Sequence, residues 1–454
     1  MVNIVRSKFD LLLISLLFLT LPLFFYKLGQ TSLVSFDEAW YGDIARNILK
    51  SGNLFLLFSN GGIYNDHPPA GFWFIALSEK IFGVSEFSVR FIPALCGFLS
   101  LIIIYLLGKE LFNRWVGFAS AIALPSATWF LFRARSGNLD VLLTMFFLLT
   151  LLLALRARKN DVYLMPLSIS LGLLFLTKSV VPLTIIPALA IIFFNNKISI
   201  QKLILSVLVF LLMVGYWFFT QLKSQPDFIN YYFFKGLPGV ETDTDYLSNL
   251  KLAKEYLHNG IGKWFWLGIF SMFSGLALRQ KRFVILATFF IIFFLPFIFS
   301  AKGHIWHLIP LHPVLILSFT GAFYVLLEKF IKNKAAINFL LVAVVLIIAY
   351  PQIRQSWQQF INIPPFVSDE AILSKEAAKY PYQFYIDGVF LPTAVYYSDK
   401  KVERISHDIL KPMFLKKEPF LLITYQWRLD DAQISSDKYQ IIKTDRDKVL
   451  LLKP

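Results

Sequence analysis

Long apolar stretches constrain this chain more than any other feature of its sequence. A stretch of about 17–25 apolar residues is long enough to cross a bilayer as a helix. Such stretches recur near residues 9–28, 88–108, 115–133, 138–155, 162–177, 179–195, 201–222, 263–279, 283–300, 306–327 and 335–351. We therefore predict an all-α polytopic membrane domain with about eleven transmembrane helices.

The composition supports a membrane protein and argues against other classes. The chain is 57% hydrophobic and 16% charged, whereas soluble domains average about 45–50% apolar and about 25% charged residues. The net charge of +15 does not indicate nucleic-acid binding, because the basic residues lie between the apolar stretches instead of gathering on one soluble face. The single cysteine, Cys96, excludes a disulfide framework and a cysteine-based zinc site. No small-residue cleavage site follows the first apolar stretch, so we expect it to remain as a span.

Basic turns predict the orientation of the spans, since Lys and Arg accumulate in short cytoplasmic loops. With the N-terminus in the cytoplasm, every second turn is basic, and these turns are 109–114, 156–161, 195–202, 279–282 and 328–334. The loops 29–87 and 223–262 are then expected on the outer face. An odd number of spans places the C-terminal segment outside as well.

The composition changes near Arg354, where charged residues become frequent and Pro364-Pro365 follows. We predict a transmembrane domain over residues 1–353 and a small soluble α/β domain on the outer side over residues 354–454. A stretch near Asp369–Lys379 predicts a helix, and short β-like runs predict strands. The predicted strands are 383–387, 394–398, 420–425, 439–443 and 448–453.

Three acidic residues are candidates for chemistry on the outer face. Asp37 and Glu38 follow the first span and begin a segment, residues 37–50, whose apolar residues recur at helical spacing, as in a helix that lies along a membrane surface. Capping of this helix by Asp37 and a favourable dipole contact of Glu38 are the structural alternative. Asp140 enters the start of the fourth span, where an acid is costly and indicates function.

Basic residues and histidines are expected at the same level of the membrane. Taken singly, each has a structural explanation, such as a snorkelling lysine or an arginine that anchors the topology. Together they predict a cationic pocket with carboxylates inside it, which suits a phosphate group carried by a membrane lipid. The residues are Arg133, Arg135, Lys178, Lys302, His304 and His307.

A rigid turn in the first outer loop adds two further candidates. Pro68-Pro69 favours an extended turn ahead of a second amphipathic stretch. Asp66 and His67 directly precede it and would be held in place there, in the same loop that carries Asp37. We include both in the predicted substrate site.

Five strings in this order resemble the GT-C glycosyltransferases of the protein O-mannosyltransferase and aminoarabinose-transferase (ArnT-like) family. The strings are FDEAWYGDIARNIL, NGGIYNDHPP, RSGNLD, FLTKSVVP and KGHIWHLIPLHP. The resemblance covers the membrane part from the first to the tenth span, and the C-terminal domain carries no motif that we can assign.

The resemblance implies roles for particular residues. Asp37 corresponds to an acid that deprotonates or orients the acceptor, Asp140 to a second acid of the site, and Lys178 to a residue that contacts the lipid phosphate. His67 stands where the aminoarabinose transferases have Lys and the O-mannosyltransferases have His. His307 stands where many relatives have Tyr. The sugar and the acceptor therefore stay open.

The function implied by this resemblance is transfer of a sugar from a polyprenyl-phosphate donor to a lipid, glycan or protein acceptor on the outer face. Asp37 would act as general base in a direct displacement with inversion. Lys178, Arg135 and His67 would stabilise the charge of the leaving phosphate. The family also implies an inner membrane, with the site facing the periplasm or the exterior.

We expect no obligatory cofactor. The sequence has no glycine-rich phosphate loop, which fits a donor already attached to lipid. Asp66, His67, His304 and His307 are suitable ligand types for a divalent metal, but they lack the spacing of a helical zinc motif. A metal therefore remains possible without being predicted.

A transporter or lipid flippase is the alternative from another functional class. Asp140 and Lys178 would then serve as substrate sites inside the membrane. Such proteins often contain inverted repeats with broken helices in both halves, and the sequence shows neither. We therefore favour the enzyme.

Overall fold

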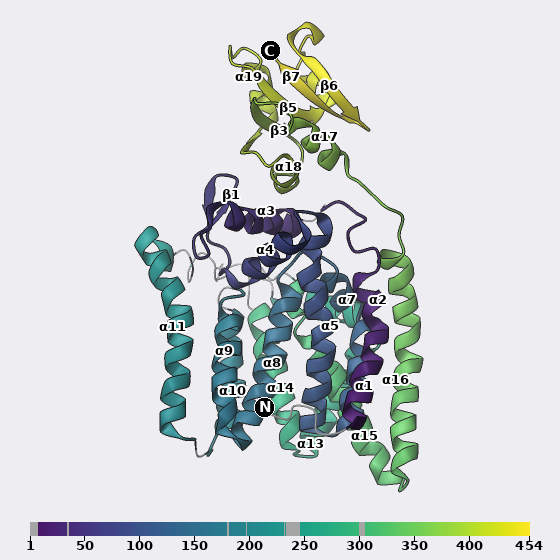
Figure 1. Cartoon of the computed structure of the whole chain (residues 1–454). Coiled ribbons are helices and arrows are strands. Elements are labelled where there is room, and N and C mark those ends of the chain that lie inside the picture. The colour runs from purple at the N-terminus through teal and green to yellow at the C-terminus, as the bar shows by residue number, and fades with distance from the viewer. Residues whose placement is uncertain are drawn as a thin grey trace. The chain divides into compact units, whose positions relative to one another are not determined.

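The computed structural model describes residues 8–33, 36–178, 181–196, 198–230, 232, 246–298 and 305–454 (Figure 1). The chain forms two compact units, and neither is continuous in sequence. The first, here called the helical unit, comprises Met1–Lys27, Asn65–Gly71 and Ile92–Ile363. The second, the mixed unit, comprises Leu28–Tyr64, Phe72–Phe91 and Pro364–Pro454.

Helices, most of them apolar, build the helical unit. They are α1 (Lys8–Leu17), α2 (Leu21–Phe25), α5 (Glu86–Leu111, shared with the mixed unit), α6 (Arg114–Ala123), α7 (Thr128–Ala134), α8 (Asp140–Lys159), α9 (Leu164–Phe175), α10 (Ile186–Phe193), α11 (Ile200–Ser224), α12 (Tyr246–Ile261), α13 (Trp264–Ala277), α14 (Lys281–Ile298), α15 (Leu311–Phe330) and α16 (Lys334–Ser356). Within the unit, α8 packs on α9, α9 on α11, and α13 on α15.

The predicted polytopic membrane domain is confirmed. Among the described residues, seven helical segments are long and apolar enough to cross a membrane, or eight if the α6–α7 pair, bent by 74°, counts as one span. Three shorter apolar helices, Asp161–Phe175, Val181–Phe193 and Trp264–Ala277, account for the remaining predicted stretches. Each of the eleven stretches therefore contains a helix in its described residues, although three of these helices are shorter than a straight span requires.

Exposed apolar side chains on α11 fit a lipid environment. Leu211, Leu212 and Phe219 expose 54%, 71% and 63% of their surface. In water an exposed apolar strip of this kind would be a liability, whereas lipid tails solvate it.

The mixed unit contains a five-stranded sheet near the C-terminus. The strands are β3 (Gln383–Asp387), β4 (Val402–Ile405), β5 (Phe420–Tyr425), β6 (Gln440–Asp445) and β7 (Lys448–Lys453), in the order β4-β3-β5-β7-β6. β4, β3 and β5 run parallel, while β7 pairs antiparallel with β5 and with β6.

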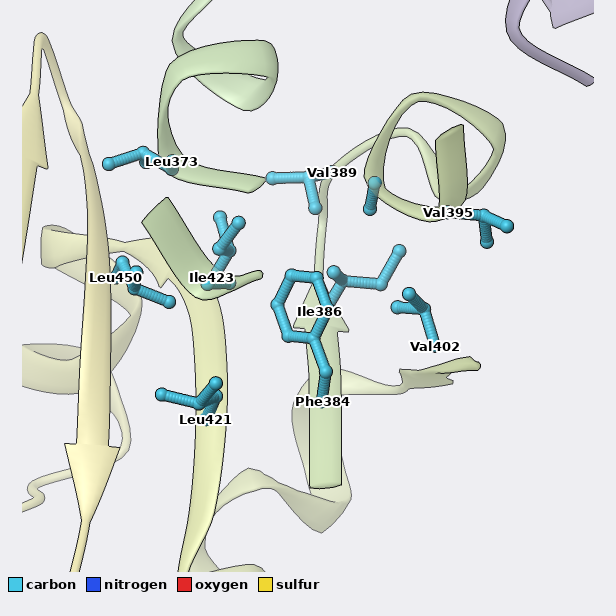
Figure 2. Packing of buried hydrophobic residues seen from close by; sticks show 11 residues of the cluster. Leu373, Phe384, Ile386, Val389, Val395, Val402, Leu421, Ile423 and Leu450 are labelled. Carbon is cyan, nitrogen blue, oxygen red and sulfur yellow. The ribbon is translucent and has the colours of Figure 1, made fainter. Parts of the chain in front are cut away.

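Helices cover both faces of this sheet because its strands alternate apolar residues between two cores. Figure 2 shows one core, in which Phe384 and Ile386 of β3 meet Leu373 of α17 (Asp369–Ala377) and Val395 of α18 (Leu391–Ser398). The opposite face packs on α19 (Leu410–Met413) and α20 (Gln426–Asp431). The predicted small α/β region is thereby confirmed.

One predicted strand is wrong. Residues 394–398 belong to helix α18, not to a strand. Two parallel neighbours such as β3 and β4 require a crossover connection, and Pro392 in the first turn suits a helix start. A short apolar run does not by itself distinguish helix from strand. The strand β4 was not predicted, because Glu403 and Arg404 interrupt its apolar pattern.

Residues of the first predicted loop pack against the C-terminal part of the mixed unit. This loop forms α3 (Phe36–Ser51), a hairpin of β1 (Leu57–Ser59) and β2 (Gly62–Tyr64), and α4 (Ala70–Phe82), of which only the residues from Phe72 onward belong to the mixed unit. Arg46 Nη1 donates to the carbonyl of Tyr396 at 2.8 Å, and the Asn60 side chain pairs with both backbone groups of Val402 at 2.7 and 2.8 Å. The predicted helix over 37–50 is confirmed; its place on a membrane surface stays a prediction.

Candidate functional site

Asp140 is the centre of the candidate site in the helical unit. It begins α8 and exposes only 2% of its surface. The backbone N–H of Asp140 donates to Asn138 Oδ1 at 2.9 Å, and Asn138 Nδ2 donates to the carbonyl of Arg133 at 2.6 Å. This turn brings the end of α7 back toward the start of α8, so that Arg133 and Asp140 face each other.

Two buried cationic side chains form ion pairs with the Asp140 carboxylate. Arg133 donates from Nε to Oδ2 at 3.0 Å and also from Nη2, while Lys178 Nζ donates to Oδ1 at 2.6 Å. Arg133 and Lys178 are 7% and 6% exposed. Buried charges are costly unless they are paired and hydrogen-bonded. The triad satisfies this requirement and keeps one net positive charge.

His67 lies beside this triad in the same unit. The loop that carries it is held by the Ala70 N–H, which donates to the carbonyl of Leu176 at 2.8 Å, just before Lys178. Burial and the charge of Lys178 lower the pKa of His67 to about 3, against the opposing effects of Asp140 and of a backbone hydrogen bond with Asp66. His67 is therefore neutral at physiological pH. Its neighbour Asp66 is half-buried.

His307 is a further predicted residue of this cluster. It belongs to the short 3-10 helix Ile305–Leu308 ahead of α15 and lies within electrostatic range of Asp140. The structure thus brings together five predicted residues from separate segments of the chain. They are His67, Arg133, Asp140, Lys178 and His307, here called the cationic cluster.

Arg135 contacts a helix end. Its Nη1 donates to the carbonyls of Leu23 and Phe24 at 3.0 Å each, and its Nη2 donates to the carbonyl of Tyr26 at 2.8 Å. These are carbonyls at the end of α2 that lack partners within the helix. Its predicted contact with phosphate stays a prediction. Lys302 and His304 lie outside the described residues.

The acidic pair of the first loop belongs to the mixed unit. Glu38 is 3% exposed and accepts from Arg90 through both oxygens, at 2.8 and 2.9 Å. Arg90 also donates to the carbonyls of Leu28 and Thr31, at 3.1 and 2.8 Å. Asp37 is half-buried in the first turn of α3. Its convergence with Asp140 and Lys178 stays a prediction.

Arg90, the buried partner of Glu38, is a residue that sequence reasoning missed. It lies in the first two turns of α5, a 26-residue helix that is otherwise largely apolar. A charge within such a helix is the signal that singled out Asp140, and the same signal could have found Arg90. Arg90 lies only four residues after Glu86, the first residue of α5, where a charged side chain is common at the end of a membrane helix.

Metal-ligand types do not cluster in the part of the chain that the structure describes. No group of three or more His, Cys, Asp or Glu side chains there could hold a metal ion. One of the four suggested ligands, His304, lies outside that part. The metal requirement therefore stays a prediction.

A family model matches the part of the chain that carries four residues of the cationic cluster. The family described as dolichyl-phosphate-mannose-protein mannosyltransferase matches residues 66–217. This range includes His67, Arg133, Asp140 and Lys178.

Two bacterial relatives match most of the chain. An uncharacterised protein from Aquifex aeolicus is 26% identical over 404 residues, which cover 85% of this chain and 79% of the relative. An undecaprenyl phosphate-alpha-4-amino-4-deoxy-L-arabinose arabinosyl transferase from Proteus mirabilis is 27% identical over 352 residues. That match covers 73% of this chain and 61% of the relative's length.

Solved structures confirm the fold of the whole chain. ArnT from Cupriavidus metallidurans in the apo state aligns with a TM-score of 0.75 and 16% identity, over 98% of both chains. The same protein bound to undecaprenyl phosphate aligns with a TM-score of 0.73 and 15% identity, over 99% of both chains. The two units thus have counterparts in one known architecture.

Proposed function

We propose that the chain is an ArnT-like member of the GT-C superfamily of membrane glycosyltransferases and that it transfers a sugar from a polyprenyl-phosphate donor. The observation that carries this proposal is the buried Arg133–Asp140–Lys178 triad, with its net positive charge. A relative of the same fold binds undecaprenyl phosphate, which supports a lipid phosphate as the group that the triad recognises.

The triad supplies what a departing lipid phosphate needs. As the bond between the sugar and the phosphate breaks, negative charge grows on the phosphate oxygen, and cations fixed beforehand stabilise it most efficiently. Both oxygens of Asp140 already accept from Arg133 and Lys178. Asp140 therefore acts as a positioning residue that holds the two cations.

His67 contributes as a neutral group. Its depressed pKa keeps the imidazole uncharged, so one ring nitrogen carries a proton and the other accepts. A neutral donor can bind a phosphate oxygen or a sugar hydroxyl without changing the net charge of the cluster. We assign His307 a contact with the same phosphate.

Asp37 is the proposed general base. Glu38 is committed to Arg90, so the role falls to the other acid of the pair. Asp37 takes the proton of an acceptor hydroxyl as that oxygen bonds to the anomeric carbon. The bond from this carbon to the phosphate oxygen breaks on the opposite face, which gives inversion and releases polyprenyl phosphate.

We infer the membrane location and the orientation of the enzyme from the family resemblance and from the basic turns of the sequence. We place the enzyme in a cell inner membrane, with a cytoplasmic N-terminus and the C-terminal part outside. The acceptor is a lipid, a glycan or a protein. We also propose that no metal is required, because the triad and His67 can provide the stabilising groups.

Donor turnover by purified protein tests the proposal. The enzyme in nanodiscs is incubated with undecaprenyl phosphate carrying a labelled pentose, hexose or amino sugar, together with a panel of acceptors. We expect release of undecaprenyl phosphate by the wild type and a loss of about 100-fold or more in Lys178→Ala. Lys202→Ala, which removes an exposed ion pair with Asp161, is the matched control and should keep wild-type turnover.

Two outcomes would overturn the proposal. Absence of release with every donor in well-folded protein would remove the transferase and favour a transporter. Equal turnover in Lys178→Ala and the control would show that the triad does not contribute to the reaction.

A further inference from the structure

A second charged and aromatic cluster lies in the sheet of the mixed unit. Asp387 is the last residue of β3 and is fully buried. Its Oδ2 accepts from Thr424 Oγ1 at 2.9 Å, and its Oδ1 accepts from Arg428 Nη1. None of these residues has a role in the proposed transfer step.

The sheet topology makes this edge a favoured place for ligands. β4 and β5 flank β3 on opposite sides and run parallel to it, so the chain order reverses at β3. In open α/β sheets, ligands bind outside the carboxyl ends of the strands at such a reversal point. Asp387 stands at the carboxyl end of β3, and Tyr425 at the end of β5. Figure 2 shows the paired residues Ile386 and Ile423 leading to this edge.

A glycine makes room for the arginine. Gly388 follows Asp387 and has φ +71°, and a Cβ there would lie 3.0 Å from Arg428 Cζ. A larger residue would therefore be strained and would also crowd the guanidinium. The geometry keeps Arg428 directly over the end of β3.

Aromatic rings surround the same guanidinium. Arg428 Cζ lies 5.2 Å from the ring centroid of Trp427 and 5.9 Å from that of Tyr425. Trp427 exposes 51% of its surface, and the Arg428 side chain exposes 24%. An exposed rigid indole beside a polar group offers one apolar face and one hydrogen-bonding neighbour.

We propose that this edge, formed by Asp387, Tyr425, Trp427 and Arg428, binds a neutral sugar ring of a glycan acceptor. This inference rests on the proposed glycosyltransferase function and names the acceptor class. The Asp387 carboxylate neutralises Arg428, so the edge does not favour an anion. Asp387 is buried and holds the guanidinium in place, while the other N–H groups of Arg428 can donate to the oxygens of neighbouring sugar hydroxyls. The apolar face of the ring stacks on Trp427.

Binding to a glycan array tests the inference. Full-length protein in nanodiscs is applied to neutral oligosaccharides and to sulfated or phosphorylated ones. We expect binding to neutral glycans, weakened about tenfold or more in Trp427→Ala and largely retained in Trp427→Phe. Trp266→Ala removes another exposed tryptophan, 41% accessible on α13, and should bind as the wild type does.

Each contrary result has a distinct meaning. Binding that is absent, restricted to anionic glycans, or equal in Trp427→Ala and the wild type would overturn the inference. Donor turnover, measured on the same preparations, reports on the proposed function separately. Turnover without glycan binding removes only this inference, whereas glycan binding without turnover removes only the proposed reaction.

Discussion

Both carboxylate oxygens of Asp140 accept hydrogen bonds from cations of the same unit. A substitution of Asp140 should therefore lower both the stability and the activity of the protein. Asp140→Asn leaves the charges of Arg133 and Lys178 buried without a counter-ion. Breaking a buried ion pair in this way costs about 3–5 kcal/mol. We expect a clear loss of thermal stability, measured by unfolding in detergent, together with loss of turnover.

Asp161→Asn is the matched control for that experiment. Asp161 pairs with Lys202 at 2.6 Å, but the two side chains are 30% and 49% exposed. Exposed pairs contribute about 0–1 kcal/mol, so this variant should melt near the wild type. Equal melting of both variants would contradict the buried triad.

The neutral state of His67 predicts the pH dependence of turnover. Burial and the charge of Lys178 lower its pKa to about 3, below the unfolded value of about 6.5. The folded protein therefore releases the His67 proton well below the range from about pH 5 to pH 8. The rate profile over that range should have the same shape in the wild type and in His67→Gln. An inflection near pH 6.5 that disappears in His67→Gln would show that a charged imidazole takes part.

Glu79 predicts a pH-dependent stability of the mixed unit. Its carboxyl group is 2% exposed, and burial raises its pKa to about 8, with Arg46 opposing the shift and Asp43 adding to it. Because the folded pKa exceeds the unfolded one, the folded state holds a proton that the unfolded state releases. The contribution of Glu79 to the free energy of unfolding therefore falls as pH rises from about 4.5 to about 8, by up to about 1.4 kcal/mol per pH unit.

Glu79→Gln should remove this dependence. The variant should have a higher free energy of unfolding than the wild type at about pH 9. At about pH 6 the difference between the two proteins should be smaller. Hydrogen exchange of α3 and α18 at the two pH values measures the difference. A gain that does not change with pH would contradict the assigned cause.

At the residue level, much of the cationic cluster could be predicted from sequence. His67, Arg133, Asp140, Lys178 and His307 are charged or polar groups next to apolar stretches, where their cost indicates function. The partners of Arg135 and Glu38 could not be predicted. Arg135 meets backbone carbonyls of α2, and Glu38 meets Arg90, 52 residues away. Neither contact has a local pattern in the sequence.

Among the elements, the contact of α5 with α6 depends on a small residue. A Cβ on Gly117 would lie 2.1 Å from the carbonyl oxygen of Tyr105. Helices in membranes approach this closely only where small residues permit it. We expect Gly117→Ala to separate the two helices and lower the melting temperature, as measured by thermal unfolding in detergent.

Gly215→Ala on α11 provides the comparison. A Cβ at Gly215 would meet nothing within 4 Å, and alanine favours helix over glycine by about 1 kcal/mol. This variant should be as stable as the wild type or more so. A Gly117→Ala protein that melts like Gly215→Ala would refute the close packing.

The sequence predicts some kinds of element better than others. The apolar stretches all became helices, since their length and composition admit few alternatives in lipid. The sequence also predicts the strands β3, β5, β6 and β7, but it predicts a strand where helix α18 lies and does not predict β4. The sequence also does not predict the polar helix α12, Tyr246–Ile261, because this helix lies in the long outer loop 223–262, whose charge is mixed.

For the molecule as a whole, contacts distant in sequence decide the organisation. The mixed unit joins three segments, and its hydrogen bonds from Arg46 to Tyr396 and from Asn60 to Val402 link residues 350 and 342 positions apart. Composition predicted a change of character near residue 354, but it could not indicate that the first loop packs on the C-terminal part. Such pairing depends on hydrogen-bond partners that leave no periodic signal.

Binding of undecaprenyl phosphate tests whether the Arg133–Asp140–Lys178 triad recognises a lipid phosphate. Affinities are measured in nanodiscs for undecaprenyl phosphate and for undecaprenol, which has the same tail and no charge. We expect tighter binding of the phosphate, by about tenfold or more, and loss of that preference in Lys178→Gln. Equal affinity for the two lipids in the wild type, or an undiminished preference in Lys178→Gln, would contradict this expectation.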